Sequence, residues 1–470
     1  MTDSVMTING EAVTGDGTFD VIDPATGAPM GAAPQCSPAQ LDLAMQAAQR
    51  AQVPWSADHE SRRKALHEAA ELMRRSAQDL GPLLTREQGA PVAGSVGSIM
   101  ISANWLDYYA DLELPEKTVR TLPDRTIEVS RRPVGVAAAL TPWNAPILLA
   151  AWKIAPALAA GATMVLKPSP YTPLTTLALG QVLAAALPPG VLNVVSGLEP
   201  LGQQLVSHPI PRKISFTGSI PTGKAVAVAA AQDLKRVTLE LGGNDAAIVL
   251  DDADIDRVAE PLFMSAFANS GQICEATKRV YVPERLYGRL LDALADLARS
   301  TPVGSGLDPD VRLGPLTTDF QRDYVEELVE DAKAAGAAIA AGGRRLPGDG
   351  YFFEPTVIGD VQDGTRIVDE EQFGPALPVI AYKDLDEAIE RANATMYGLA
   401  GSVWSPDVDR ARTVAARLVT GRVKINSGGL PSPEAPFGGV KWSGVGVENG
   451  PWGLEEYTDL HVTEVGAGPQ

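Results

Sequence analysis

The 470-residue chain contains only two cysteines, Cys36 and Cys274, and only four histidines. Two cysteines cannot form a disulfide framework, so we expect a reducing, cytoplasmic location. No pair of histidines or cysteines stands at the spacing of metal ligands, which argues against a metal site. None of the histidines lies in a local catalytic signature, so any catalytic base must be a carboxylate.

Long apolar runs and an excess of basic charge are also absent. No stretch approaches the roughly 20 apolar residues that span a bilayer, and the N-terminus lacks the basic start and apolar core of a signal peptide. The formal net charge of -19 argues against a nucleic-acid or anionic membrane surface. With 45% hydrophobic and 21% charged residues the chain is globular, and its length predicts two or three substructures.

Helices and short apolar strands alternate along most of the chain. Ser37 is a candidate N-cap of one helix, and a second helix is expected from about Ser61. From Val134 onward, apolar strands alternate with helices, which predicts a parallel sheet covered by helices. The segment 236–243 and the strand after it are expected to open a second α/β region, and residues 119–132 alternate like an exposed strand or hairpin arm.

Two residues are candidates for nucleophilic chemistry. The polar stretch NSGQICEATKR (269–279) gives Cys274 the flexible setting that a reactive thiol needs, although a small hydrophobe in a core helix is the alternative. Cys36 lies in a cap region without such neighbours and is expected to be structural. Glu240 closes the apolar strand of LELGG, where a buried glutamate would require a partner or a proton. The alternative is a strand-end glutamate that reaches solvent.

Two further segments could bind a phosphate-bearing ligand. FTGSIPTGK (216–224) has glycines between a strand and a helix, so free amides at the helix start could hold a pyrophosphate. It is neither a GxGxxG fingerprint nor a P-loop, and a simple helix cap is the alternative. Lys167 ends a neighbouring strand, where open α/β sheets bind ligands, unless it is a solvated loop lysine.

Seven motifs taken together resemble those of the aldehyde dehydrogenase superfamily, in its order and at its spacing. They are TPWNAP (141–146), VLKPSP (165–170), FTGS (216–219), LELGG (239–243), GQIC (271–274), EQFGP (371–375) and PFGGVKWSG (436–444). The resemblance covers about residues 20 to 465. It implies an α/β fold with a Rossmann-like cofactor domain, an α/β catalytic domain and a small β oligomerisation arm. The domains it implies are 1–115 with 134–242 for the cofactor, 243–443 for catalysis, and 116–133 with 444–470 for the arm and tail.

The resemblance also assigns catalytic roles. Cys274 falls on the nucleophile, Asn144 on the side-chain donor of the oxyanion hole, Glu240 on the general base and Glu448 on a second glutamate implicated in proton relay. These positions imply NAD(P)-dependent oxidation of an aldehyde to the acid through a thiohemiacetal and a thioester on Cys274. The alternatives are a semialdehyde or coenzyme A-acylating dehydrogenase, a thiol-dependent esterase, and an inert structural relative of the fold.

The cofactor positions follow from the same resemblance. They are Thr141, Pro142, Trp143, Lys167, Gly202, Phe216, Thr217, Gly218, Ser219, Leu241, Glu371 and Phe373. Two departures matter. Pro170 replaces a glutamate that often marks NAD preference, and no arginine in KPSPYTPL could bind a 2′-phosphate, so we expect NAD, with NADP as the alternative. Val447 replaces an arginine common in the SGxGRE segment.

The resemblance further implies the walls of a substrate tunnel. These positions are Ala145, Leu148, Trp152, Ala268, Ile273, Pro431 and Phe437. Many family members carry aromatics where Ala145, Ala268 and Pro431 stand, so we expect room for a bulky aromatic or branched aldehyde. The wall positions include no arginine or lysine, which disfavours a carboxylated semialdehyde.

Two expectations concern neighbours of the site and partners of the chain. Glu275, directly after the nucleophile, could raise the pKa of the thiol by charge repulsion, or it could point away into a salt bridge. The implied arm pairs with another subunit, so a homodimer or homotetramer is expected. A small-molecule aldehyde is the expected ligand, with no nucleic acid and no membrane as partner.

Overall fold

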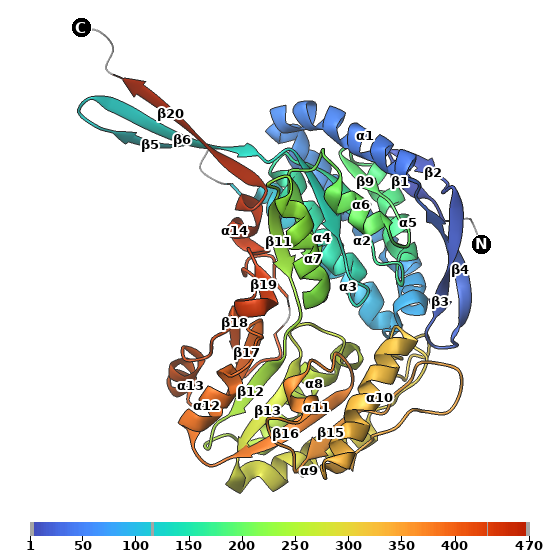
Figure 1. Ribbon diagram of the computed structural model, residues 1–470, viewed down its shortest axis with the longest axis vertical. Coiled ribbons are helices and arrows are strands. Elements are labelled where there is room, and N and C mark those ends of the chain that lie inside the picture. Colours follow the sequence, from blue (N-terminus) through green and yellow to red (C-terminus); the bar gives the residue numbers. More distant parts are fainter. Residues whose placement is uncertain (1–3, 114–116, 430, 467–470) are drawn as a thin grey trace.

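A computed structural model describes residues 4–113, 117–429 and 431–466, and these residues fold around two open sheets (Figure 1). The predicted cofactor domain and the predicted arm and tail include some residues that lie outside the described ones, which are 1–3, 114–116 and 467–470, and residue 430 also lies outside them. Apart from the short strand β19, the chain forms the first sheet and its helices from residues before 243, and it forms the second sheet from residues after 243.

The first sheet has eight strands, of which the five in the middle are parallel. In order across the sheet they are β19 (Gly444–Val445), β11 (Arg236–Glu240), β10 (Lys213–Thr217), β7 (Val136–Leu140), β8 (Thr163–Lys167), β9 (Leu192–Val194), β1 (Met6–Ile8) and β2 (Glu11–Val13). The predicted parallel sheet is therefore confirmed for the central strands. The flanking strands β1, β2 and β19 pair in the antiparallel sense, which the sequence did not indicate.

Helices cover this sheet in two layers, because its central strands are buried on both faces. One layer has α4 and α5 against the strands with α2 and α3 outside them, and the other has α1, α6 and α7. The helices are α1 (Pro38–Ala57), α2 (His59–Gln88), α3 (Val92–Asp111), α4 (Pro146–Ala159), α5 (Leu174–Ala184), α6 (Leu201–Ser207) and α7 (Ile220–Ala231).

The start of the first helix follows the sequence closely. The Ser37 side chain accepts from the Gln40 backbone, and the Gln40 side chain accepts from the Ser37 backbone, which is a complete capping box. Helix α2 begins earlier than expected, at His59, because Asp58 accepts a hydrogen bond from the Ser61 amide and serves as its N-cap.

The second sheet has seven strands. In order they are β14 (Ala338–Ala341), β15 (Thr356–Gly359), β16 (Ala376–Tyr382), β13 (Thr277–Pro283), β12 (Asp245–Val249), β17 (Ala400–Trp404) and β18 (Arg422–Ile425). Only β14 is antiparallel to its neighbour. One face packs on α8 and α9 and the other on α10 to α13, so each face has its own apolar core. These helices are α8 (Ile255–Phe267), α9 (Glu284–Ser300), α10 (Asp319–Ala334), α11 (Arg366–Asp369), α12 (Leu385–Asn393) and α13 (Val408–Ala415).

One boundary between the two sheets differs from expectation. The segment 236–243 was expected to open the second region, which is wrong, because β11 pairs with β10 in the first sheet. The chain crosses between the sheets at Gly242 and Gly243. A Cβ on Gly242 would lie 2.1 Å from Glu371 Oε2, and one on Gly243 would lie 2.8 Å from the Cys274 carbonyl oxygen. A side chain at position 243 would therefore press on the backbone of the catalytic loop, and one at position 242 would displace the Glu371 carboxylate.

A three-stranded antiparallel arm projects from the body beside α14 (Gly450–Glu455) (Figure 1). Its strands are β5 (Lys117–Thr121), β6 (Arg125–Pro133) and β20 (Thr458–Gly466). The predicted hairpin in residues 119–132 is confirmed by β5 and β6. A separate hairpin of β3 (Gly17–Asp23) and β4 (Ala28–Gln35) lies near the N-terminus. Among the described residues, no helix is both long and apolar enough to span a membrane.

Candidate active site

The loop after α8 carries Cys274 in a turn and not in a helix. A short 3₁₀ segment (Ala268–Gly271) turns the chain, with Asn269, Ser270 and Gly271 all at positive φ. A Cβ on Gly271 would lie 2.2 Å from the Gly374 carbonyl oxygen, so a glycine is required there. The Ser270 hydroxyl donates to the Gly314 carbonyl at 2.7 Å and holds the turn in place. Cys274 is half-buried at the end of this turn, whereas Cys36 is buried in the first core.

Cys274 lies on the wall of a cavity of about 770 Å³ between the two sheets. All seven predicted wall residues line this cavity, together with Asn144. Trp152 is a large part of the wall, because its ring stacks on Trp105 and meets Phe437 edge to face. Arg312 and Lys424 line the same cavity. The wall positions named from the sequence include no cation, but two other residues of the wall are cations. The absence of cations can therefore no longer be used as an argument against a carboxylated substrate.

Asn144 is placed against the catalytic loop. Its side-chain amide donates to the Gln272 carbonyl at 2.9 Å, and its own carbonyl accepts from Asn269 at 3.0 Å. A primary amide has two N–H groups, and within the described residues only one of them donates to a protein acceptor. The second N–H is thus available to an oxygen atom bound in the cavity beside Cys274.

Glu240 ends β11 and is only 3% exposed. Among the described residues, neither of its carboxylate oxygens has a hydrogen-bond partner. Burial raises the pKa of this carboxyl group well above its ordinary value, and the charge of Glu448 raises it further, while Lys153 acts in the opposite direction. The raised pKa favours the protonated form of Glu240 over a wider pH range than for an ordinary glutamate, and the side chain is not exposed at the surface.

A buried ion pair lies next to Glu240 and was not predicted in full. Lys153 Nζ contacts Glu448 Oε1 at 2.5 Å, and it also donates to the hydroxyls of Ser215 (3.1 Å) and Thr217 (2.8 Å). Both charged side chains are almost fully buried. Sequence reasoning found Glu448 but missed Lys153. The signal was available, because Lys153 is the only charge in the apolar helix α4.

The carboxyl ends of β7 and β10 form the point where the strand order of the first sheet reverses. Open α/β sheets bind nucleotides at such a crevice. The loop with Thr141 follows β7, and Ser219 follows β10 as the N-cap of α7. The Thr141 hydroxyl is buried without a partner among the described residues, which fits a site that is completed by a ligand. Within the part of the chain that the structure describes, the Lys167 ammonium at the end of β8 makes one long hydrogen bond, to the Pro168 carbonyl at 3.4 Å. The residues present therefore fit a dinucleotide.

Two more predicted cofactor residues approach the crevice from the second sheet. Glu371 accepts from the Gly243 amide at 3.1 Å, and burial raises the pKa of its carboxyl group to about 7, with Lys278 acting in the opposite direction. Phe373 meets the ring of Trp143 edge to face, with centroids 5.3 Å apart. The structure thus brings the EQFGP and TPWNAP motifs together. The other cofactor positions taken from the sequence lie in or next to β7, β10, β11 and α6, and they are Pro142, Gly202, Phe216, Thr217, Gly218 and Leu241.

Glu275 lines the cavity and forms a double ion pair with Lys424 (3.0 Å) and Arg422 (3.4 Å). Of the two expectations for this residue, the salt bridge is confirmed. The expected charge repulsion is present as well: burial raises the pKa of the Cys274 thiol, and the charge of Glu275 raises it further.

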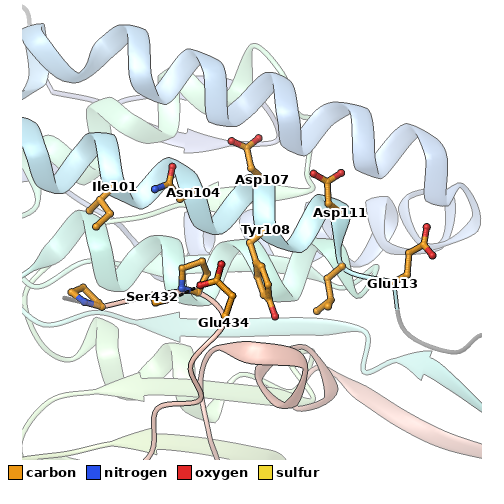
Figure 2. Close-up of a pocket in the computed structure, with 11 residues that line it drawn as sticks. Ile101, Asn104, Asp107, Tyr108, Asp111, Glu113, Ser432 and Glu434 are labelled. Atoms are coloured by element: carbon orange, nitrogen blue, oxygen red, sulfur yellow. Dashed lines mark hydrogen bonds between the residues drawn. The ribbon is translucent and has the colours of Figure 1, made fainter. Parts of the chain in front are cut away.

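A second hollow, of about 670 Å³, lies between α3 and the loop 431–434 and shares Pro431 with the catalytic cavity (Figure 2). Figure 2 shows the carboxylates of Asp107 and Asp111 pointing away from this loop. They pair instead with three side chains of α2, which are Arg63, His67 and Arg74. These acids therefore hold α2 against α3.

The Aldehyde dehydrogenase family model matches residues 12–463 of the chain. Among curated proteins, the chain is 40% identical to the 3-sulfolactaldehyde dehydrogenase of Pseudomonas putida, over 98% of this chain and 96% of that protein. It is 39% identical to the succinate-semialdehyde dehydrogenase [NADP(+)] of Escherichia coli, over 97% and 95%. It is 40% identical to the betaine aldehyde dehydrogenase of Cereibacter sphaeroides, over 96% and 94%.

Solved structures show the same likeness. The NAD+ complex of aldehyde dehydrogenase from Bacillus cereus superposes with a TM-score of 0.96 at 35% identity, over 99% of this chain and 97% of that one. An NADP-dependent enzyme from E. coli superposes with the same score at 37% identity, over 99% and 98%. The predicted α/β fold class is confirmed by these neighbours.

The buried pair of Lys153 and Glu448 generates a stability prediction. Lys153→Met leaves the Glu448 carboxylate buried without its cation. We therefore expect the free energy of unfolding, measured in urea, to be about 3–5 kcal/mol lower than in the parent protein. The double variant Lys153→Met/Glu448→Leu removes both charges and should recover most of that loss. An unchanged urea midpoint for Lys153→Met would contradict the role given to this pair.

Proposed function

Because the chain belongs to the aldehyde dehydrogenase family, we propose that it oxidises an aldehyde to the carboxylic acid with Cys274 as the nucleophile. The family match confirms the resemblance drawn from the seven motifs, and the chain is an oxidoreductase that acts on aldehydes. One observation carries the mechanistic proposal. Cys274 and Asn144 share the wall of one largely apolar cavity, while Glu240 is buried nearby as an unpartnered acid.

The residues of the chain can perform the chemistry as follows. The Cys274 sulfur bonds to the aldehyde carbon, and the thiol proton passes to the Glu240 carboxylate. The free N–H of Asn144 and the backbone N–H of Cys274 stabilise the negative oxygen, and such a donor contributes about 3 kcal/mol. Oxidation of the thiohemiacetal leaves a thioester on Cys274. Glu240 then takes a proton from the water that hydrolyses the thioester.

Lys167, Ser219 and Glu371 would hold NAD, which would supply the acceptor for the hydride. The residues around it then have clear tasks. The charges of Lys153 and Glu448 act on the Glu240 carboxyl group, and we assign the relay of its proton to Glu448, whose Oε2 has no partner among the described residues. Because burial raises the pKa of Glu240, the carboxylate form that acts as a base grows as pH rises. We therefore propose that turnover increases with pH.

Glu240→Gln should separate the two half-reactions. The variant keeps Cys274 and Asn144, so a first burst of NADH, of at most one per active site, should remain while steady turnover falls at least about 100-fold. Stopped-flow absorbance over a range of pH measures both, and the rise of turnover with pH should flatten. Cys274→Ala is the control and should give neither burst nor turnover. Equal turnover in Glu240→Gln would contradict the proposed base, and turnover that requires added coenzyme A would favour the acylating alternative.

We further propose that the chain prefers NAD to NADP. Pro170 leaves the ribose without the expected carboxylate, but Glu199 stands in the loop after β9, and its Oε1 lies 2.6 Å from where a Cβ on Gly202 would stand. Burial lowers the pKa of the Lys167 ammonium to about 8, and the charge of Glu199 opposes that shift, which places the two side chains near each other. The backbone N–H of Gln203 donates to Glu199 Oε2 at 3.4 Å and helps to orient it. A carboxylate here would accept from ribose hydroxyls and repel a 2′-phosphate.

Glu199→Gln tests this preference by binding alone. Removing the negative charge should raise the affinity for NADP relative to NAD by about tenfold, which corresponds to 1.4 kcal/mol. Isothermal titration with each dinucleotide measures the ratio without any aldehyde. Glu71→Gln, on the exposed face of α2, serves as the control. If both affinities fall equally in Glu199→Gln, this residue does not discriminate between the cofactors.

The cavity supports the proposal of a bulky aldehyde. The small side chains of Ala145 and Ala268 leave open space, and Trp152 and Phe437 provide aromatic surface beside it. A second candidate is an aldehyde that carries an acidic group far from the carbonyl. Arg312 favours it, because this exposed side chain lines the cavity and has no ion-pair partner among the described residues, whereas Lys424 is already paired with Glu275. Relatives named for sulfolactaldehyde and succinate semialdehyde are consistent with this candidate.

Arg312→Ala distinguishes the two substrate classes when it is assayed on a matched pair of aldehydes. With 4-carboxybenzaldehyde, loss of the guanidinium should lower kcat/KM about tenfold, while 4-methylbenzaldehyde should be oxidised as before. Arg289→Ala, at a distant exposed ion pair, is the control. Equal effects on both aldehydes would remove the acidic substrate from consideration, and a clear preference for acetaldehyde in the parent enzyme would contradict the bulky substrate altogether.

We also propose that the arm joins subunits into a homodimer or homotetramer. Its strands β5 and β20 expose Val119 (52%), Leu460 (63%) and Val462 (53%) on a sheet that extends away from the body (Figure 1). Such surfaces in water favour burial against another protein surface.

A further inference from the structure

Glu275 is tied to the edge strand of the second sheet. Its carboxylate lies 3.0 Å from Lys424 Nζ and 3.4 Å from Arg422 Nη1, and both cations stand on β18. The side chains of Glu275 and Lys424 are only 10% and 9% exposed, so water screens this pair weakly. An acid directly after the nucleophile is thus held by two cations from a distant part of the chain.

Lys424 makes a second contact that reaches the substrate cavity. Its ammonium donates to the Gly428 carbonyl at 2.8 Å. Its methylene carbons lie 3.0 Å from where a Cβ on Gly429 would stand, and Gly429 has a φ of +68°. Gly428, Gly429 and Pro431 all line the cavity that holds Cys274. One ammonium therefore joins the residue after the nucleophile to the loop that forms the cavity wall.

We propose that Glu275, Lys424 and Arg422 form an ion-pair clamp that sets the reactivity of the Cys274 thiol and fixes the substrate loop. This proposal rests on the proposed function in one respect, which is that Cys274 is the nucleophile. A bare carboxylate beside the sulfur disfavours the thiolate, and the two cations offset that effect. Glu275 and Lys424 are thus positioning residues, and the clamp explains how an acid is tolerated next to a nucleophile.

Other charges also face Cys274, and the clamp acts in addition to them. Lys278 on β13 favours the thiolate, whereas Asp245 on β12 and Glu240 on β11 disfavour it. All three stay in place when the clamp is altered. Changes in thiol reactivity in clamp variants can therefore be compared against a constant background.

Alkylation by iodoacetamide, a neutral reagent, measures the thiol without aldehyde or cofactor. In a Cys36→Ser background, Glu275→Gln should react about threefold to tenfold faster than the parent below the thiol pKa, with its pH midpoint shifted down. Lys424→Met leaves Glu275 with Arg422 alone, so it should react slower by a similar factor, with its midpoint shifted up. Mere loosening of the loop would move both variants in the same direction, so opposite signs identify the charge effect.

Further variants serve as controls for the alkylation experiment. Lys424→Gln retains a donor for the Gly428 carbonyl without the charge, and it replaces Lys424→Met if that variant does not fold. Glu71→Gln and Arg75→Met alter an exposed ion pair on α2 and should leave alkylation unchanged. Changes of the same sign in Glu275→Gln and Lys424→Met, or no change in either, would overturn the clamp. Loss of aldehyde oxidation in the parent with normal alkylation would overturn the proposed function and leave the clamp standing.

Discussion

The ion pair between Lys153 and Glu448 is the interaction on which the rest of the site depends. Removing two charges from water is costly, and the cost is offset only if the geometry is good and the remaining hydrogen-bonding groups are satisfied. Here the pair joins three parts of the chain. Lys153 stands on α4, whose first turn follows Asn144, and Glu448 exchanges two backbone bonds with Phe437 in the cavity wall. The hydroxyls that complete the pair come from β10, which leads into the cofactor loop. Substrate wall, oxyanion donor and cofactor loop thus share one anchor.

The same burial gives the catalytic carboxyl group its character. Glu240 lies near the Glu448 carboxylate, whose own cation is Lys153, and it is almost fully buried. Burial is the first cause of its raised pKa, and the charge of Glu448 is the second. A group in this setting can accept a proton from a thiol or a water molecule and pass it on, because neither of its states is locked by a strong partner. The absence of partners among the described residues is therefore a functional property of this glutamate.

Much of the arrangement could be predicted from the sequence because motifs at strand ends report on positions that the fold brings together. Local sequence signals predicted the parallel strands, the capped helix at Ser37 and the cavity wall. What could not be predicted depends on pairing over long distances. Lys153 and Glu448 are 295 residues apart, and Arg312 reaches the cavity from a loop with no motif. The placement of β11 was missed because an apolar strand looks the same whichever sheet it joins, and only the crowded Gly242–Gly243 crossing decides it.

The charged residues around the cavity add two properties that an apolar pocket alone would lack, which are control of the thiol and recognition of an acidic group. Aromatic and small side chains give volume and surface without preference for a charged group, so they accept a substrate by shape. The charged residues lie at the margins, where Glu275 and its two cations cancel each other beside the sulfur and Arg312 stays free toward solvent. A buried unpaired charge next to Cys274 would hold the thiol in one protonation state, so the pairing of Glu275 keeps the nucleophile responsive. Within the described residues, Arg312 is the one cation of the cavity wall without an ion-pair partner, and its exposed position still allows recognition of an acidic group.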